Sequence, residues 1–140
     1  MKRSISILAV AVSLSAPVAN AAATTVTVYK SSSCGCCEGR VRHLQSAGIE
    51  AKVVNTDDVD SVKDRVGVPK AMRSCHTAIV RDTNQIIEGH VPATAVKKLL
   101  ANPNIRGVAA PGMPMNSPGM GQMDGKLVTI DFVGKKFSQD

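Results

Sequence analysis

Three of the chain's four cysteines fall within four positions, in the segment SSSCGCCEGR at residues 31–40. Cys34 and Cys37 form a C-x-x-C pair, and Cys36 is an additional thiol inside it. A disulfide scaffold spreads its cysteines along the chain, and a zinc ribbon matches one pair of cysteines with a second, distant pair. Three thiols at one point favour either dithiol redox chemistry or the binding of metal ions by several sulfur atoms.

A second group of candidate ligands lies further along the chain. Cys75 and His76 are adjacent in SCHTAIV, and His90 lies in EGHVP. Soft thiolate and imidazole ligands without carboxylates select Cu(I) or Zn(II) over harder cations. If these residues converge with the C-x-x-C segment, the predicted metal ligands are Cys34, Cys36, Cys37, Cys75, His76 and His90. The alternative for Cys75 is an ordinary buried cysteine that meets the other three by chance.

One further histidine and four methionines are weaker candidates. His43 follows Cys36 by seven residues, which places it on the same face of a helix but ~10 Å further along the axis. This spacing favours a supporting or structural histidine over a ligand of a shared mononuclear site. Thioethers suit Cu(I), but a loop folded over the core would also bury methionines. Both interpretations stay open for the methionines of the C-terminal loop, which are Met113, Met115, Met120 and Met123.

Strand and helix patterns alternate around these motifs. Apolar and β-branched residues alternate in the segments that predict strands, and Gly, Pro, Ser or Asp residues mark the ends of the predicted helices. We expect strands at 24–30, 50–55, 75–82 and 85–91, and helices from 33 or 34 to about 47, from 57 to 67 and from 92 to 102. The order β-α-β-α-β-β-α, a parallel βαβ unit followed by a hairpin and a closing helix, predicts an α/β fold of the thioredoxin-like type.

This fold would place the C-x-x-C pair at the start of the first helix, directly after the first strand. Backbone N–H groups and the helix dipole stabilise a thiolate there and lower its pKa. Cys37 shares a helix face with Val41 and Leu44, so we expect its side chain to point inward. Cys36 lies ~100° around the helix from Cys37, and we expect it to face outward or along the crevice.

The third and fourth strands would bring the remaining ligands to the same crevice. In a thioredoxin-like fold, the loop that enters the third strand contacts the C-x-x-C pair, normally through a cis-proline. This chain carries Cys75 and His76 at that point instead of a proline. The turn after the fourth strand, which carries His90, also approaches the site in such folds. We therefore expect all six candidate ligands to converge.

Residues 107–125 differ in character from the segments that precede them. They hold five Gly, three Pro and four Met without periodicity, and we expect neither a regular helix nor a central strand there. Residues 127–137 alternate again and predict a short terminal strand or hairpin arm. The predicted organisation is a signal peptide at 1–21, a thioredoxin-like metal-binding domain at 24–102, and a C-terminal extension at 103–140 that packs on the same domain.

The N-terminal segment has the composition of a secretory signal peptide. It has a charged start, MKR, an apolar run from residue 5 to about 14, and the small residues Ala19 and Ala21 at the expected cleavage site. This pattern predicts a periplasmic protein that begins near Ala22. A retained amphipathic anchor is the alternative, but no polar face recurs at helical spacing. No later stretch approaches ~18 consecutive apolar residues, so we expect no membrane span after cleavage.

The charge pattern bears on the partners of the mature chain, whose ~119 residues suffice for one domain with a core. Without Lys2 and Arg3 the chain carries 15 basic and 11 acidic side chains, which are scattered, and very few aromatic residues. Nucleic-acid binding uses a clustered basic face, often with stacking aromatic rings, so we do not expect it here. We expect a monomer whose partner is a metal ion.

Five motifs in order carry a resemblance to a known family. They are CGCC, the HL of the first helix, SCHTA, EGHVPA and PGMP-x-NSPGM. Together they resemble the periplasmic copper-resistance family known as CopG, which is distinct from the plasmid repressor of that name, and the resemblance covers residues 24–137. It implies a thioredoxin-like domain with a C-terminal extension and copper ions held at the CxCC cysteines. It also implies an interconversion of Cu(I) and Cu(II) alongside copper-efflux components.

Three functions are compatible with these residues. The first is a copper-binding redox protein of copper resistance, which is the interpretation that the resemblance favours. The second is a thiol–disulfide oxidoreductase that uses Cys34 and Cys37, but a surplus thiol beside a catalytic pair invites off-pathway disulfides. The third is a zinc chaperone or structural zinc site, which Cys/His ligands also allow. No catalytic residue is assigned, and whether the protein is a copper oxidoreductase stays open.

Overall fold

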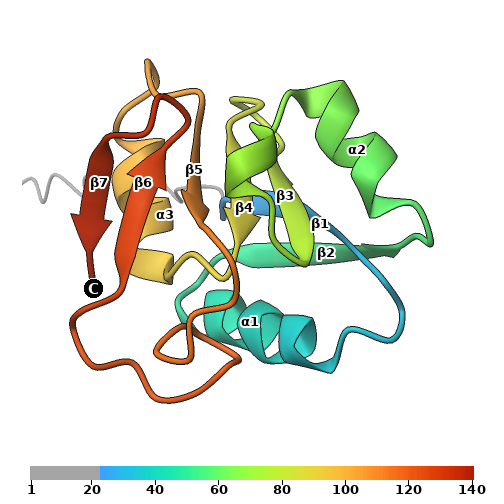
Figure 1. Ribbon diagram of the computed structural model, residues 1–140, viewed down its shortest axis with the longest axis horizontal. Coiled ribbons are helices and arrows are strands. Elements are labelled where there is room, and N and C mark those ends of the chain that lie inside the picture. Colours follow the sequence, from blue (N-terminus) through green and yellow to red (C-terminus); the bar gives the residue numbers. More distant parts are fainter. Residues whose placement is uncertain (1–22) are drawn as a thin grey trace, which may run out of the picture.

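The computed structural model describes residues 23–140, and the predicted signal peptide lies outside them. Over these residues the chain forms a mixed α/β structure in which one seven-stranded sheet is combined with three α-helices and a short 3-10 helix (Figure 1). In chain order the elements are β1 (Thr25–Lys30), α1 (Gly35–Ser46), β2 (Glu50–Asn55), α2 (Val59–Val66), η1 (Lys70–Met72), β3 (His76–Val80), β4 (Ile86–Gly89), α3 (Ala93–Leu100), β5 (Gly107–Ala110), β6 (Val128–Asp131) and β7 (Lys136–Gln139). None of the helices in this part of the chain is long and apolar enough to cross a membrane.

The seven strands lie in the order β2-β1-β3-β4-β5-β6-β7. β1 and β2 are parallel and are connected through α1, whereas β3 is antiparallel to both β1 and β4. The predicted α/β class, the parallel βαβ unit and the order of the predicted strands and helices up to α3 are confirmed. The thioredoxin-like detail and the domain boundaries stay predictions.

The ends of the first two helices follow from local chemistry. Asp58 caps α2 by accepting a hydrogen bond from the Ser61 N–H at 3.0 Å, and Gly67 ends the helix in the left-handed conformation with φ of 72°. Cys34 occupies the N-cap position of α1, but its side chain makes no capping hydrogen bond. The sulfur atom of Cys34 is therefore not engaged by the backbone N–H groups of the helix.

One face of α1 packs on the sheet. Cys37 and Leu44 are completely buried and Val41 nearly so, which confirms the predicted inward face. Val41 and Leu44 belong to the main core, together with β1 residues and the apolar residues of α3. This packing fixes the start of α1, and hence the CxCC motif, against the sheet.

The prediction that residues 107–125 contain no central strand is wrong for their first four residues. Gly107–Ala110 form β5, which lies between β4 and β6 with all four residues buried. The ring of Phe132 lies so close to Gly107 that a Cβ there would be 2.6 Å from Phe132 Cε2. A strand that is buried on both faces shows no alternation of apolar and polar residues. Because β5 is also built from small residues, its sequence gave no pattern that indicates a strand. Both arms of the terminal hairpin, β6 and β7, are present.

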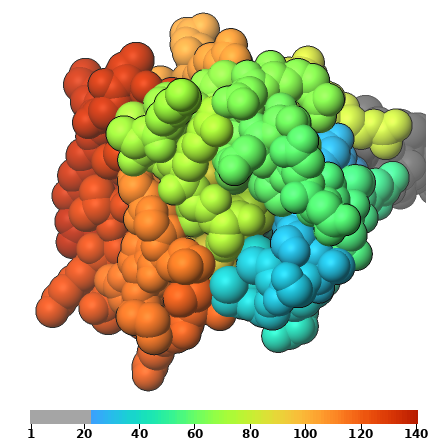
Figure 2. Space-filling model, turned by 45° about the vertical axis from the view of Figure 1, so that its right-hand side comes forward, coloured from blue at the N-terminus to red at the C-terminus, as the bar shows by residue number. Residues whose placement is uncertain are grey.

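The long loop between β5 and β6 returns to α1. Figure 2 shows this orange segment beside the cyan start of α1, with the yellow-green segment that leads into β3 between them. Gly119, with φ of +89°, packs on the helix so closely that a Cβ there would lie 2.6 Å from the Arg40 backbone N. The loop therefore closes one side of the space in front of the CxCC motif.

Candidate metal centre

The register of the central strands brings the candidate ligands together. β1 ends at Lys30, which lies opposite His76 at the start of the antiparallel β3. The CxCC motif follows β1 by three residues, so it emerges beside Cys75. On the other side of β3, Thr77 pairs with Glu88, and this register carries His90, just after β4, to the same end of the sheet.

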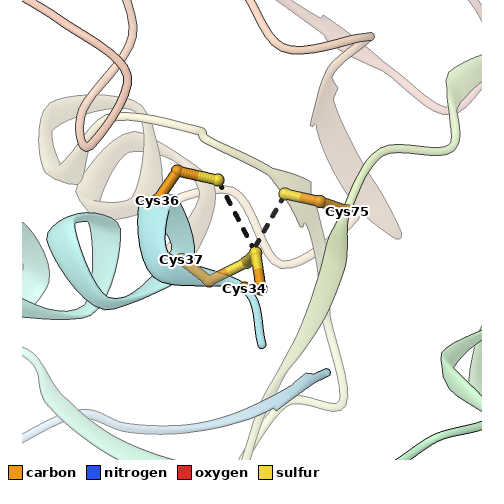
Figure 3. Close-up of side chains that lie close together, drawn as sticks. All are labelled: Cys34, Cys36, Cys37 and Cys75. Atoms are coloured by element: carbon orange, nitrogen blue, oxygen red, sulfur yellow. Dashed lines mark hydrogen bonds between the residues drawn. A yellow bond between two sulfur atoms is a disulfide. The ribbon is translucent and has the colours of Figure 1, made fainter. Parts of the chain in front are cut away.

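The four cysteines form one group (Figure 3). Cys34 and Cys37 are joined by a disulfide, and a free thiol lies near each of its sulfur atoms. Cys36 Sγ is 3.6 Å from Cys34 Sγ, and Cys75 Sγ is 3.6 Å from Cys37 Sγ. All four sulfur atoms lie within 4.8 Å of one another. The expected convergence of the cysteines is thus observed, while their role as ligands stays a prediction.

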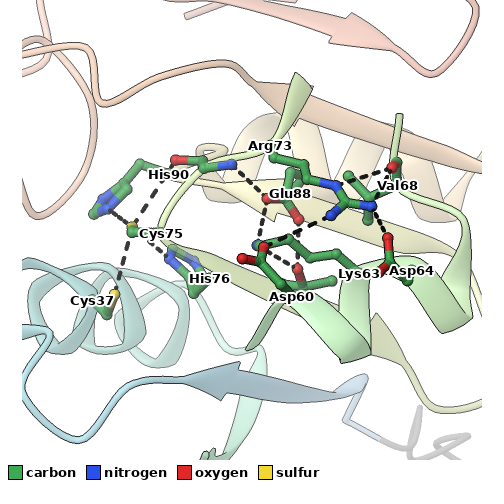
Figure 4. A network of polar contacts seen from close by, with 12 residues as sticks. Cys37, Asp60, Lys63, Asp64, Val68, Arg73, Cys75, His76, Glu88 and His90 are labelled. Atoms are coloured by element: carbon green, nitrogen blue, oxygen red, sulfur yellow. Dashed lines mark hydrogen bonds and ion pairs between the residues drawn. The ribbon is translucent and has the colours of Figure 1, made fainter. Parts of the chain in front are cut away.

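The two buried histidines extend this group (Figure 4). Cys75 Sγ lies 3.0 Å from His90 Nε2 and 3.3 Å from His76 Nδ1. Ligand atoms of Cys37, Cys75, His76 and His90 form a second set within 4.8 Å, so the two sets share Cys37 and Cys75. The six predicted side chains therefore make one continuous arrangement, which we call the Cys/His cluster.

A second contact fixes the orientation of His90. Its Nδ1 donates a hydrogen bond to the carbonyl oxygen of Pro118 at 2.7 Å, which leaves the lone pair of Nε2 directed at Cys75. Histidines that bind metals typically have their other ring nitrogen held in this way. Burial lowers the pKa of His90, although the hydrogen bond to Pro118 opposes the change. His90 is therefore presented as a neutral imidazole, the form that binds metals.

His76 and Cys75 are also held in their neutral forms. Burial is the main cause that lowers the pKa of His76 well below its ordinary value, and the charge of Arg40 adds to it. Burial and the charge of Cys36 raise the pKa of the Cys75 thiol to about 11. A metal ion that binds Cys75 must therefore displace a proton from it.

A buried ion pair, absent from the sequence prediction, supports the loop that carries Cys75. Glu88 Oε1 accepts hydrogen bonds from Lys63 Nζ at 2.7 Å and from the Ser74 backbone N–H at 2.6 Å. Its other oxygen accepts from the Thr77 hydroxyl at 2.6 Å, and Glu88 is completely buried. The carboxylate inside the apolar strand QIIEGHV was the available signal, because a buried charge requires partners.

Arg40 is the second residue that the sequence prediction missed. It lies on α1 and is completely buried. None of its three side-chain nitrogen atoms has a hydrogen-bond partner among the described residues. Its position three residues after Cys37 and four after Cys36, on the face that Cys37 shares with Leu44, was the signal that could have identified it.

The weaker candidates lie apart from the Cys/His cluster or are exposed. His43 Nε2 accepts a hydrogen bond from the Ala93 backbone N–H at 3.0 Å, so it connects α1 to the start of α3. His43 belongs to neither set of converging ligand atoms. Met113 and Met115 are 53% and 69% exposed, so neither is buried by the loop, and Met120 is half-buried.

Comparisons with known proteins define the class and then the family. The fold and the Cys/His cluster describe an α/β protein with a candidate site for a soft metal ion. Residues 72–120 match the model of a family described as a protein of unknown function, DUF411. No match was found among curated proteins.

Two solved structures named as copper resistance protein CopG, forms 1 and 2, are similar to this chain over most of its length. Each is 34% identical in sequence. The match to form 1 has a TM-score of 0.72 and covers 83% of this chain and 96% of that structure's chain. The match to form 2 has a TM-score of 0.73 and covers 84% of this chain and 98% of that structure's chain. The chain belongs to the CopG family of copper resistance proteins.

Proposed function

We propose that this protein is a periplasmic copper-binding protein of copper resistance that holds copper in the Cys/His cluster and interconverts Cu(I) and Cu(II). The observation that carries the proposal is the convergence of two overlapping sets of Cys and His ligand atoms, each within 4.8 Å. Both sets contain soft donors and no carboxylate, which suits Cu(I) more than harder cations. The similar structures are named as copper resistance proteins, which favours copper over zinc.

The Cys34–Cys37 pair provides this chain with its own two-electron couple. In the reduced protein, each of the two thiols would give up one proton and one electron, and the S–S bond would form. The two electrons would convert two Cu(II) ions to two Cu(I) ions, so atoms and charge balance. The remaining donors, Cys36, Cys75, His76 and His90, would still be available to hold Cu(I). Copper-efflux components are the partners that we expect to receive or deliver the ions.

The experiment begins with the protein purified from the periplasm of copper-fed cells, in which metal content and absorption spectra are measured. We expect bound copper, and bound zinc alone would contradict the proposal. The reduced protein is then titrated with Cu(I) under anaerobic conditions for His76→Gln, His90→Gln and the matched control His43→Gln. Loss of a direct ligand should lower copper stoichiometry or change the spectrum, and loss of a supporting group should lower affinity about 10–100-fold. The control should bind as the wild type, because His43 lies outside the cluster.

A thiol–disulfide oxidoreductase is the second candidate, favoured by the disulfide with a free thiol 3.6 Å from each end. Cys36→Ser distinguishes the two functions. A dithiol catalyst needs only Cys34 and Cys37, so it should survive this change, whereas a hydroxyl cannot replace a soft copper ligand. We expect lower copper stoichiometry and lower copper tolerance in cells, with negligible disulfide reductase activity in both proteins. Strong reductase activity that persists in Cys36→Ser, with copper tolerance unchanged, would favour the second candidate.

A further inference from the structure

Arg40 places a positive charge in the interior beside the Cys/His cluster. It is completely buried, and it follows Cys36 and Cys37 by one turn on the same side of α1. Gly119 packs against its backbone N–H, and the preceding residue, Pro118, accepts the hydrogen bond from His90. Arg40 therefore lies between the CxCC motif and the loop that orients His90, and its side chain is buried.

This guanidinium has no internal partner. Nε, Nη1 and Nη2 all lack hydrogen bonds within residues 23–140, and no carboxylate of that part of the chain forms an ion pair with them. An unpaired buried charge is strongly unfavourable unless an opposite charge is close. Burial lowers the pKa of Arg40 to about 9, which still leaves it cationic at neutral pH, and a negative Cys75 would raise it.

The group whose negative form would stabilise the charge of Arg40 is Cys75 of the cluster. Arg40 follows Cys37 by three residues on the same buried face of α1, and its charge is one cause of the lowered pKa of both His76 and His90. Thiolates appear in the cluster when a metal ion displaces the thiol protons. The charge partner of Arg40 is then the metal–thiolate complex as a whole.

We propose that Arg40 is the counter-charge of the metal–thiolate complex and makes the site selective for monovalent copper. With the same number of thiolates, a Cu(I) complex carries one more negative charge than a Zn(II) complex. A fixed positive charge nearby therefore stabilises the Cu(I) complex more. One unit of charge at ~6–10 Å in a protein-like dielectric corresponds to about 10–100-fold in affinity. This inference rests on the proposed function and adds a residue that sets its specificity.

The same difference of one charge separates Cu(I) from Cu(II) in an unchanged ligand set. Arg40 should therefore favour the reduced ion and raise the reduction potential of bound copper. Each tenfold change in relative affinity corresponds to about 59 mV for a one-electron couple. A residue that acted only by filling space would shift neither the potential nor the preference between the two metals.

The test uses the full mature chain with Arg40→Met, which keeps length and removes charge, and Arg40→Lys, which keeps the charge. Affinities of the reduced proteins for Cu(I) and for Zn(II) are measured separately by competition with a chromophoric chelator. We expect Arg40→Met to lower the ratio of Cu(I) to Zn(II) affinity by about 10–100-fold, and Arg40→Lys to recover most of it. An equal loss of affinity for Cu(I) and Zn(II) in Arg40→Met, or no loss of affinity for either metal, would overturn the inference.

A measurement on the metal-free proteins separates charge from structure. Because Arg40 has no partner, the metal-free Arg40→Met protein should be at least as resistant to denaturant as the wild type. A clearly less stable variant would mean that Arg40 has a structural partner, and the inference would fail. If the wild type itself binds no copper, the proposed function fails first. Copper binding with the same metal preference in all three proteins would refute only the role of Arg40.

Discussion

Cys75 is the residue at which the other members of the cluster meet. Its sulfur atom lies 3.0 Å from His90 Nε2, 3.3 Å from His76 Nδ1 and 3.6 Å from Cys37 Sγ. Burial raises its pKa to about 11, so the thiol is protonated at neutral pH. Copper uptake at this residue therefore releases a proton, and apparent copper affinity should fall as the pH is lowered.

The metal-free protein should lose stability when the pH falls below about 6.5. His76 and His90 have folded-state pKa values below 6.5, the ordinary value that applies in the unfolded chain. The unfolded chain therefore binds more protons in this range, and the free energy of unfolding decreases as the pH falls toward the folded-state values. The loss is at most about 1.4 kcal/mol per pH unit for each histidine. Denaturant unfolding between about pH 7.5 and 5.5 measures it.

The His76→Gln variant provides the control for this effect. Both histidines are completely buried, and burial lowers the pKa of His76 well below the ordinary value. Replacing it with a neutral side chain should make the free energy of unfolding less dependent on pH over the same range. An unchanged pH dependence would show that His76 takes up a proton without unfolding.

At the residue scale, sequence reasoning identified the ligand types but missed their charged neighbours. The six members of the cluster could be named because Cys and His have few other roles at such spacing. Arg40 and Glu88 were missed because a charged residue on a helix or strand is usually exposed, and their positions on buried faces were the only signals against that default. Their burial comes from the tertiary packing, in which Gly119 of the 111–127 loop packs on the Arg40 backbone and the Ser74 N–H before β3 donates to Glu88.

Among the elements, the loop between β5 and β6 has the most direct effect on the cluster. Gly119 packs on α1 with φ of +89°, and Pro118 fixes His90 through its carbonyl oxygen. Both contacts require the backbone of the loop to approach closely. The Gly- and Pro-rich composition, which predicted no regular structure, is thus what permits this approach.

Gly119→Ala should displace this loop and release His90. A Cβ at this position would lie 2.6 Å from the Arg40 backbone N, in addition to the strain of a positive φ. We expect a loss of about 2–4 kcal/mol, which combines the strain of the left-handed conformation with steric overlap. The control is Gly112→Ala, at φ of +71° with no atom within 4 Å of the added Cβ, which should cost only about 1–2 kcal/mol.

Two measurements check this prediction. Denaturant unfolding compares the two alanine variants, and NMR of the imidazole reports whether His90 Nδ1 still carries the proton that it donates to Pro118. Equal stability of both variants, with an unchanged His90 signal, would show that the loop does not hold the histidine in place.

The sequence predicted the three helices and the strands β1 to β4, but it missed β5. Periodicity and caps, such as Asp58 and Gly67, located α1 and α2 to within a few residues. β5 was missed because Gly107, Val108 and two alanines are all buried and show no alternation. Its identity as a strand comes from its pairing with β4 and β6, which are distant in sequence from each other.

At the scale of the whole molecule, the C-terminal strands complete the sheet that carries the site. β5 pairs with β4, and Val108 and Ala110 belong to the same core as the β1 and α3 residues. Lys98 also donates a hydrogen bond to the Phe137 carbonyl oxygen and lies over its ring. The sheet from β2 to β7 therefore shares its core with the elements that present the Cys/His cluster.

A chain that ends at Asn104 should fail to fold cooperatively. It would lose β5, β6 and β7 and leave β4 as an unprotected edge with its apolar face uncovered. We expect rapid proteolysis, aggregation and loss of a cooperative denaturant transition, and weak copper binding by the cysteines alone. Limited proteolysis and circular dichroism would test this. A truncated protein with a sharp transition would show that residues 24–102 form an independent domain.

The short separation of the two bonded cysteines has a consequence for the energetics of redox change. Cys34 and Cys37 are three residues apart, so their disulfide closes a very small loop. Such a loop restricts the unfolded chain by only about 2 kcal/mol, whereas a bond between Cys37 and Cys75 would contribute about 4 kcal/mol in the same treatment. Opening the native bond therefore leaves most of the conformational stability intact. The molecule can gain and lose a pair of electrons at sulfur while its architecture persists, so electron exchange and unfolding are largely uncoupled.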